Sequence, residues 1–353
     1  MISIKVPARI CFFGDHQDYL GLPVIAGTIN RFIELNAEPI SNAEFQLELQ
    51  DIQKSRKIPL DLNGITISKG DYLLSSMAVL KKKGYHFEQG YRVVISGTIP
   101  VNAGLSSSSA LTVAWIRFLI AIQEEEPAVD DIKIGHWAYE AEVGYFNSPG
   151  GLMDQYTIAQ QGLLYIDTKT GKTQRLSGDL GKLVVAESGI SKKTLEVLKN
   201  ARLYQEKAIT EVKKGNPSFD IQNATITDYD RFKSLVAFEY QDHWYAAIHN
   251  YDITLKVKEI LEKGEIDLTQ IGKLMNQHQH ILETQIGNTP NEMVLMMQAA
   301  RREGALGAKT IGSGGGGCMV AMVTESLKNR VMKAFIECGA KSAYEVELTY
   351  PAT

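Results

Sequence analysis

A change in hydrophobic periodicity near residue 180 constrains the fold of this chain more than any other feature. Before it, apolar residues often alternate with polar ones, as in Ile2-Ile4-Val6, which is typical of strands with one solvated face. Beyond it, segments such as 194–213 follow the 3.6 period of amphipathic helices. Strand, helix and strand patterns return between Cys318 and Leu348. We therefore predict an α+β fold, with a strand-rich N-terminal domain (1–180) and a helix-rich C-terminal domain (181–353) closed by a small sheet.

The same patterns predict individual elements. Phe32-Glu34-Asn36 and Phe45-Leu47-Leu49 are expected to form an antiparallel pair of strands. Residues 163–167 and 174–176 are expected to form a hairpin. Other strands are expected at 2–13 and 91–95, and other helices at 71–83, 107–123, 132–143, 228–238, 253–263, 271–284 and 291–303.

Composition and charge exclude several classes of protein. The 353 residues carry 37 basic and 41 acidic side chains, a net charge of −4 without a long basic run, which disfavours binding to duplex nucleic acid. No segment approaches the ~18 consecutive apolar residues of a membrane-spanning helix. The N-terminal residues show no export signal, and Cys11, Cys318 and Cys338 have no CxxC spacing. We expect a cytoplasmic protein with free, structural cysteines.

Two glycine-rich sequences imitate nucleotide-binding motifs without their context. Gly171-Lys172-Thr173 ends like a P-loop, but Ile166 stands where the first glycine is required, so we expect only a hairpin turn. Residues 312–317 satisfy G-x-G-x-x-G, but the strand pattern CMVAMV follows where a dinucleotide-binding fold needs a helix. Glycines ahead of a strand instead allow close approach to a second backbone or to a ligand.

The segment PVNAGLSSSSALTVAWIRFL, residues 100–119, predicts a phosphate site. A strand pattern ends at Ile99, and a glycine turn, four serines and an apolar helix follow. Glycine lets the backbone approach a bulky anion, and the start of a helix presents free N–H groups and a favourable dipole. A serine-rich helix cap is the alternative, but one serine suffices for a cap.

Two further segments concentrate polar side chains beside apolar sequence. GGLMDQY places Asp154 at the start of a helix after a glycine pair, and Glu142 lies near the end of the preceding helix. Such carboxylates can supply a base and a metal ligand, although a solvated pair is the alternative. In RICFFGDHQDYLG, residues 9–21, Arg, Asp, His and Tyr crowd behind an apolar strand, where they can bind an anion or a polyol.

Taken together and in this order, these segments resemble the GHMP kinase superfamily. PVNAGLSSSSA resembles its phosphate-binding motif, and KTIGSGGGGC resembles its C-terminal glycine motif. ARICFFGDHQDY is similar to the galactokinase signature G-R-x-N-L-I-G-E-H-x-D-Y, and GGLMDQY is similar to the galactokinase segment C-G-I-M-D-Q. The resemblance implies a two-domain α+β fold with a small antiparallel sheet in the C-terminal domain and an active site in the cleft between domains. It also implies transfer of the ATP γ-phosphoryl group, with Mg²⁺, to the anomeric hydroxyl of galactose or a related sugar such as a heptose.

The resemblance also assigns roles to matching residues. Asp154 matches the catalytic base, and Arg9 matches the arginine beside the acceptor oxygen. Ser108 and Glu142 match the Mg²⁺ ligands. The residues that match ATP contacts are Gly104, Leu105, Ser106, Ser107, Ser108, Gly314 and Gly315, and those that match sugar contacts are Asp15, His16, Asp18 and the backbone of Gly151.

Departures from the galactokinase pattern leave alternatives open. Asp15 stands where galactokinases have Glu, and GSGGGGC is closer to mevalonate and heptose kinases. A mevalonate-type kinase is one rival, which Arg9 disfavours because mevalonate kinases have Lys there. An inactive sugar or ATP sensor on the same fold is a second rival, which intact Arg9, Ser108, Glu142 and Asp154 disfavour.

Overall fold

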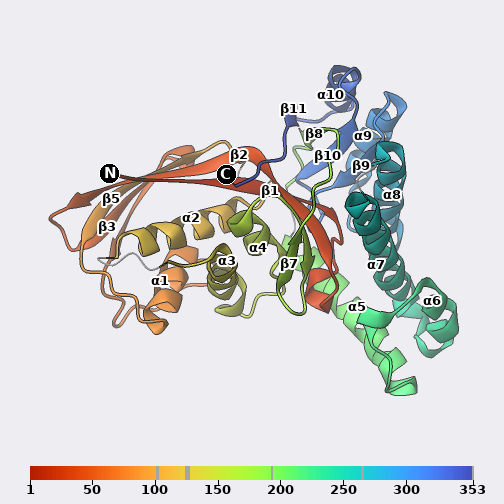
Figure 1. Ribbon diagram of the computed structural model, residues 1–353, viewed down its shortest axis with the longest axis horizontal. Coiled ribbons are helices and arrows are strands. Elements are labelled where there is room, and N and C mark those ends of the chain that lie inside the picture. The colour runs from red at the N-terminus through yellow and green to blue at the C-terminus, as the bar shows by residue number, and fades with distance from the viewer. Residues whose placement is uncertain (101–102, 124–127, 192–193, 264–265, 352–353) are drawn as a thin grey trace.

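The computed structural model describes residues 1–100, 103–123, 128–191, 194–263 and 266–351. It contains two sheets, and helices pack against each of them (Figure 1). The first sheet comes from the N-terminal half of the chain, and helices dominate the C-terminal half together with a smaller antiparallel sheet. The predicted α+β class is therefore confirmed.

The first sheet has seven strands and is organised around the long strand β2 (Val24–Ile40). Strand β2 pairs with β1 (Ile2–Phe13) along one edge, and with β5 (Gly90–Gly97) and β6 (Leu163–Asp167) along the other. The other strands are β3 (Glu44–Leu49), β4 (Lys54–Pro59) and β7 (Lys172–Arg175), in the order β4-β3-β5-β2-β6-β7. Strands β6 and β7 form the predicted hairpin, with Gly171 in its turn.

The predicted pairing of Phe32–Asn36 with Phe45–Leu49 is wrong. Strand β5 lies between β2 and β3, antiparallel to β2 and parallel to β3. Strand β3 finds its antiparallel partner in β4 instead. Alternating sequence correctly indicates which side chains of a strand face the core, but it carries no information about the neighbouring strand.

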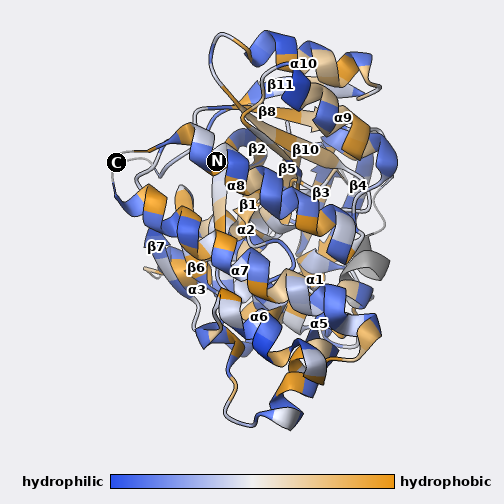
Figure 2. Ribbon diagram, turned by 90° about the vertical axis from the view of Figure 1, so that its right-hand side faces the viewer, coloured by the Kyte–Doolittle hydropathy of each residue, from blue (hydrophilic) through white to orange (hydrophobic). Residues whose placement is uncertain are grey.

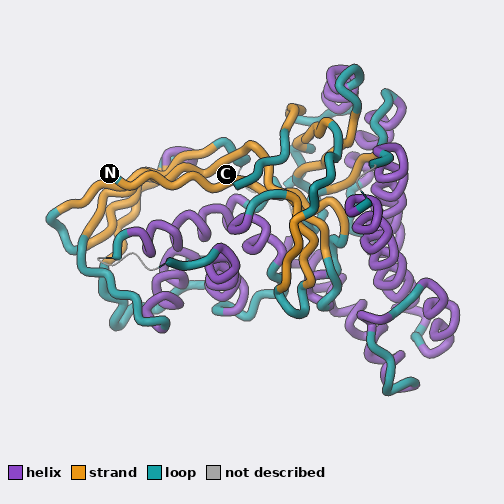
Figure 3. Tube along the Cα trace, in the orientation of Figure 1, coloured by secondary structure: helices purple, strands orange, loops and turns teal. Residues whose placement is uncertain are grey.

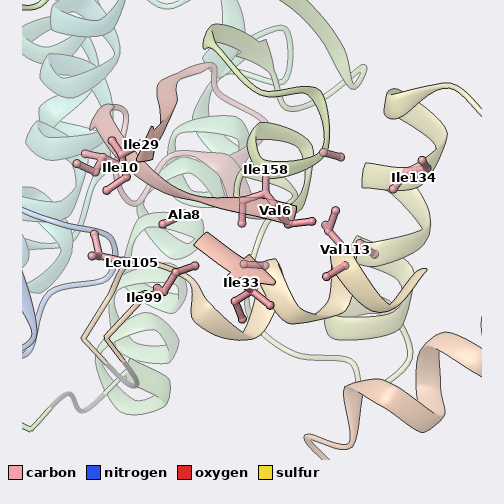
Figure 4. Packing of buried hydrophobic residues seen from close by; sticks show 14 of the residues in the cluster. Val6, Ala8, Ile10, Ile29, Ile33, Ile99, Leu105, Val113, Ile134 and Ile158 are labelled. Atoms are coloured by element: carbon pink, nitrogen blue, oxygen red, sulfur yellow. The ribbon is translucent and has the colours of Figure 1, made fainter. Parts of the chain in front are cut away.

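Helices from the N-terminal half cover one face of the first sheet (Figure 1). They are α1 (Tyr72–Lys82), α2 (Ser107–Ala121), α3 (Asp131–Tyr139) and α4 (Met153–Gln160). Helix α2 is apolar on most sides because it is almost completely enclosed by the sheet and its neighbouring helices. Val6, Ala8 and Ile10 of β1 belong to the same buried cluster as Val113 of α2 and Ile158 of α4 (Figure 4).

The second sheet has four antiparallel strands in the order β11-β8-β10-β9. They are β8 (Lys182–Glu187), β9 (Gly307–Thr310), β10 (Cys318–Val323) and β11 (Ser342–Val346). The apolar strands β8 and β10 lie beside α9 (Asn291–Arg302) and α10 (Lys328–Glu337), and Figure 2 shows their hydrophobic residues there. Strand β10 directly follows the glycine run, in agreement with our rejection of a dinucleotide-binding fold.

The remaining helices of the C-terminal half are α5 (Thr194–Gly215), α6 (Ile226–Phe232), α7 (Gln241–Glu262) and α8 (Leu268–Ile281). Figure 3 shows these helices at one end of the first sheet, and α7 and α8 contact β1 there. The helix predicted at 228–238 stops at Phe232, and the one predicted at 253–263 begins earlier, at Gln241. The prediction missed the first half of α7 because its buried face mixes Trp244 and Tyr251 with polar Asn250.

Within the described residues, no helix is long and apolar enough to cross a bilayer. The three cysteines are free, and Cys11 and Cys318 are buried.

Candidate active site

A cavity of about 710 Å³ lies between the two halves of the molecule. This size is within the usual range for small-molecule sites. The first half contributes residues from β1, the following loop, the start of α2, the turn after α3 and the start of α4: Arg9, Asp15, His16, Asp18, Gly104, Ser106, Ser107, Ser108, Glu142, Gly151 and Asp154. The second half contributes a smaller group that includes Gly189, Ile190, Ser191, Gly312, Ser313, Gly317 and Lys341. The structure thus brings together most of the side chains selected from the sequence.

Arg9 and Asp154 form a bidentate ion pair at the wall of the cavity. Nε of Arg9 donates to Oδ1 of Asp154 at 2.7 Å, and Nη2 donates to Oδ2 at 3.1 Å. The Arg9 side chain is only 3% exposed, whereas that of Asp154 is 27% exposed. Burial alone would lower the pKa of Arg9, but the Asp154 carboxylate outweighs this effect and raises it. The pair therefore presents a fixed carboxylate to the cavity, backed by a permanent positive charge.

Residues at the start of α2 form further hydrogen bonds with both members of this pair. Gly104 has a φ of +94°, and its carbonyl accepts a hydrogen bond from Nη1 of Arg9 at 3.0 Å. Ser106 precedes the helix in a left-handed conformation, and its hydroxyl donates to Oδ2 of Asp154 at 2.5 Å instead of capping the helix. The N–H groups of the first helical turn have no partner within the helix. They are thus suited to an anion near Ser107 and Ser108, which line the cavity.

Glu142 and Ser108 form a second polar group in the cavity. Glu142 lies in a π-helical turn (Glu140–Gly144) after α3, a geometry that often occurs at functional sites. Its Oε1 accepts from the hydroxyl of Ser108 at 2.7 Å, and its Oε2 accepts from the amide of Gln155 at 2.6 Å. Burial raises the pKa of Glu142 above its ordinary value despite these hydrogen bonds. A buried carboxylate beside a hydroxyl fits Mg²⁺, which binds oxygen ligands and needs few of them from the protein.

The loop after β1 supplies Asp18, which lies against the glycine pair. A Cβ on Gly151 would approach Oδ2 of Asp18 to 2.2 Å, so no larger residue fits there without displacing the carboxyl group. Burial, followed by the negative charges of Asp154 and Asp15, raises the pKa of Asp18 to about 7. The resemblance assigned Gly151 a backbone contact, and the structure adds that its missing side chain makes room for Asp18.

His16 connects this loop to the glycine run. Its φ is +63°, an uncommon conformation for a residue with a side chain. Nε2 of His16 is 3.0 Å from the carbonyl of Ser313 and 3.1 Å from the amide nitrogen of Asn288. Nδ1 is 3.0 Å from the hydroxyl of Tyr19. The imidazole therefore forms hydrogen bonds that connect the N-terminal half of the chain to the C-terminal half at the edge of the cavity.

Asp15 is paired with Lys309, a residue that the sequence analysis missed. Nζ of Lys309 lies 2.7 Å from Oδ2 of Asp15, and both side chains are almost completely buried. Burial would raise the pKa of Asp15, but the positive charge of Lys309 lowers it below the ordinary value. A lysine inside the buried strand GAKT was the available signal, because a buried lysine requires a partner. Gln155, the partner of Glu142, was also missed, although it directly follows Asp154.

Three predicted ATP contacts do not line the cavity. Leu105 is completely buried in the core of the N-terminal half (Figure 4). A Cβ on Gly314 would come within 2.5 Å of the Asn288 carbonyl, and the N–H of Gly315 donates to that carbonyl at 2.6 Å. These glycines permit close packing of two backbone segments. Gly312 and Gly317 border the cavity in their place.

Comparisons with known proteins identify the family to which this chain is similar. The family model for the GHMP kinases N terminal domain matches residues 71–162, and the model for GHMP kinases C terminal matches residues 257–341. The galactokinase of Streptococcus thermophilus is 30% identical, covering 97% of this chain and 92% of that protein. Among solved structures, Lactococcus lactis galactokinase complexed with galactose has a TM-score of 0.86 at 20% identity, covering 99% and 95% of the two chains.

Methanococcus jannaschii mevalonate kinase has the same fold, with a TM-score of 0.72 at 20% identity and coverage of 99% and 98% of the two chains. Kinases that act on different substrates thus share this fold. The family matches and the 30% identical relative show the superfamily of this chain. The chain belongs to the GHMP kinases.

Proposed function

We propose that this protein transfers the γ-phosphoryl group of ATP to the anomeric hydroxyl of a monosaccharide, galactose or a related sugar such as a heptose. The observation that carries the proposal is the Arg9–Asp154 pair, whose partly exposed carboxylate faces the cavity beside the start of α2. The 30% identical relative is named a galactokinase, which supports a sugar as the acceptor. On this proposal, residues 1–180 and 181–353 are the two domains that bind the substrates between them.

Each residue of the site has a defined task in this reaction. Asp154 accepts the proton of the acceptor hydroxyl as the new P–O bond forms. Arg9 keeps that carboxylate oriented and adds positive charge beside the attacking oxygen. The first-turn N–H groups of α2 bind the phosphates of ATP. The donor phosphorus and the acceptor oxygen are thus held in line, which supplies most of the catalysis in phosphoryl transfer.

Ser108 and Glu142 are the residues that would bind Mg²⁺ in this site. Their oxygens are 2.7 Å apart, and Gln155 fixes the carboxylate from its other side. The bound ion would neutralise charge on the β- and γ-phosphates. Within the described residues there is no cluster of three or more His, Cys, Asp or Glu side chains suited to a metal, so this two-residue arrangement is the candidate site.

Asp15 and Asp18 are the proposed side-chain contacts to the sugar, since both residues line the cavity and carboxylates accept hydrogen bonds from hydroxyl groups. Gly151 would contribute its backbone beside the base. Both ring nitrogens of His16 already have partners in the protein, so its contribution is to position the loop that carries the two carboxylates.

A screen for ADP release with a panel of acceptors tests this function. The panel contains galactose, L-arabinose, L-fucose, glucuronate, D-manno-heptoses and mevalonate, each with ATP and Mg²⁺. We expect turnover with at least one sugar and none with mevalonate. Turnover with mevalonate alone would favour the mevalonate-type rival, and nucleotide binding without turnover of any acceptor would favour the inactive sensor.

A further inference from the structure

We propose that Lys309 is a positioning residue for sugar recognition, which fixes the Asp15 carboxylate at the cavity wall as a hydrogen-bond acceptor for a sugar hydroxyl. This inference rests on the proposed function, and it assigns a role to a residue of the C-terminal half that does not itself line the cavity. The arrangement would make selection of the sugar depend on a contact between the two sheets.

The surroundings of Lys309 leave its ammonium group little freedom. Lys309 lies in β9, is completely buried, and donates to the carbonyls of Cys11 at 3.0 Å and Thr310 at 2.5 Å. The carboxylate of Asp15 is its third neighbour, at 2.7 Å. An ammonium group has three N–H donors, and these three oxygens account for all of them. The ammonium therefore joins β1, the loop after β1, and β9.

Asp15 retains acceptor capacity on Oδ1. The residue lines the cavity, although it is only 2% exposed and both of its carboxylate oxygens are buried. Within the described residues, Oδ2 is paired with Lys309 at 2.7 Å, whereas Oδ1 receives no hydrogen bond. A buried polar oxygen without such a bond is costly, and a carboxylate can accept several. A donor that enters the cavity, such as a sugar hydroxyl, would satisfy it.

Lys309 is also the cation that dominates the electrostatics of Asp15. The other groups with an electrostatic effect on Asp15, or affected by it, are His278 of α8, Cys11 and Arg9 of β1, and His16 and Asp18 of its own loop. Burial and the nearby Lys309 lower the pKa of His278 to about 3, so its ring is neutral at physiological pH. Arg9 is engaged by Asp154. Loss of Lys309 would leave burial largely unopposed and raise the pKa of Asp15.

The role of Lys309 is tested by measuring the KM values for sugar and ATP in Lys309→Met and Lys309→Arg. Lys333→Met, at an exposed position of α10, is the matched control. We expect Lys309→Met to raise the KM for the sugar roughly tenfold or more, the effect of losing a hydrogen bond to a charged group. The KM for ATP should change little. Lys309→Arg should recover much of the loss, and Lys333→Met should behave like the wild type.

The pH dependence separates positioning from a purely structural role. In Lys309→Met, the ratio of variant to wild-type sugar KM should fall as pH rises, because Asp15 regains its charge. A ratio that does not change with pH, or an equal increase in the KM values for sugar and ATP, would overturn the role of Lys309.

If Lys309→Met does not fold, the double variant Asp15→Asn/Lys309→Met replaces it in the test. The double variant contains no uncompensated buried carboxylate and should therefore fold. Its sugar KM should match that of Asp15→Asn alone, and a clearly larger KM would contradict action through Asp15. If the wild type phosphorylates no sugar, the proposed function fails and the role of Lys309 fails with it. If the wild type is active and Lys309→Met keeps its sugar KM, only the role of Lys309 fails.

Discussion

The cavity has two ends that are built in different ways. At the phosphate end, Asp154 contacts Arg9 and Ser106, and Glu142 contacts Ser108, all within the N-terminal half. At the sugar end, the loop after β1 is fastened to the C-terminal half, by contacts that join residues almost 300 positions apart in the sequence. The contacts of the phosphate end form within one sheet and its helices. The contacts that hold the loop at the sugar end require both halves of the chain.

This difference implies that substitutions at the two ends should have different effects. A change at the phosphate end should alter turnover or the requirement for metal and leave the rest of the molecule intact. A change at the sugar end should alter sugar affinity and also the contact between the two halves.

Asp154→Asn removes the proposed base and should lower kcat by at least ~10². The variant should still fold, because an amide has nearly the same size and shape as the carboxylate, but with lower stability, because the buried Arg9 loses its counterion. ATP affinity should stay close to that of the wild type. Steady-state kinetics and equilibrium nucleotide binding measure the two properties. Asp230→Asn at an exposed site on α6 is the control. Turnover like that of the wild type in Asp154→Asn would remove Asp154 from the mechanism.

Asp15 should determine which sugar is preferred. The side chain of Asp is shorter than that of Glu by one C–C bond, which is about 1.5 Å long. Galactose should therefore be used poorly by the wild type, and Asp15→Glu should improve its kcat/KM by roughly 10- to 150-fold, as expected for one regained hydrogen bond to a charged group.

The measurement for Asp15 is kcat/KM across the sugar panel, with Asp15→Asn as the variant that keeps size but loses charge. If galactose is already the best substrate of the wild type and Asp15→Glu does not improve it, the role given to the shorter side chain is wrong.

Glu142→Gln should raise the Mg²⁺ concentration needed for half-maximal activity. Loss of the carboxylate removes a proposed metal ligand, and we expect a shift of roughly tenfold or more, because losing a residue that merely supports a ligand already has an effect of that size. Glu140→Gln, two residues earlier and paired with Lys83 at 2.7 Å, is the matched control. A magnesium titration that Glu142→Gln leaves unchanged would place the ion elsewhere.

Asp18 should make the stability of the ligand-free protein depend on pH. Its folded-state pKa is about 7, above the ordinary value of 3.8, so the folded state binds more protons than the unfolded state between these values. Stability should fall as pH rises from about 4 to 7. Asp18→Asn should therefore raise Tm at pH 8 and leave it nearly unchanged at pH 4. Equal Tm shifts at both pH values would show that Asp18 does not titrate in this way.

All four predicted sugar contacts line the cavity, whereas three of the predicted ATP contacts do not. The contacts that hold the two ends together nevertheless differ in how far the sequence encodes them. Asp154 and Ser108 lie at helix starts, and a helix start combines local signals of glycine, serine and acidic residues that can be read along the chain. The pairing of Asp15 with Lys309, and of His16 with Ser313, depends on how two sheets pack, and no local pattern encodes such packing.

The fold shows the same limit. The elements of β1, α2 and the β6–β7 hairpin were predicted from periodicity and turn residues. The insertion of β5 between β2 and β3 was missed, because neighbour choice is a property of the assembled sheet. The glycine run was correctly expected to allow close approach, but only the structure shows that Gly314 faces a backbone and Gly317 the cavity.

The most direct test of the central claim is ³¹P NMR of the product formed from ATP and the best sugar of the panel. Asp154 and Arg9 are proposed to act on the anomeric oxygen, so the product phosphorus should couple to a single anomeric proton and appear as a doublet. This signal should be strongly reduced with Asp154→Asn. A product phosphorus that couples to two methylene protons, or a doublet that forms equally fast without the Asp154 carboxylate, would contradict the account.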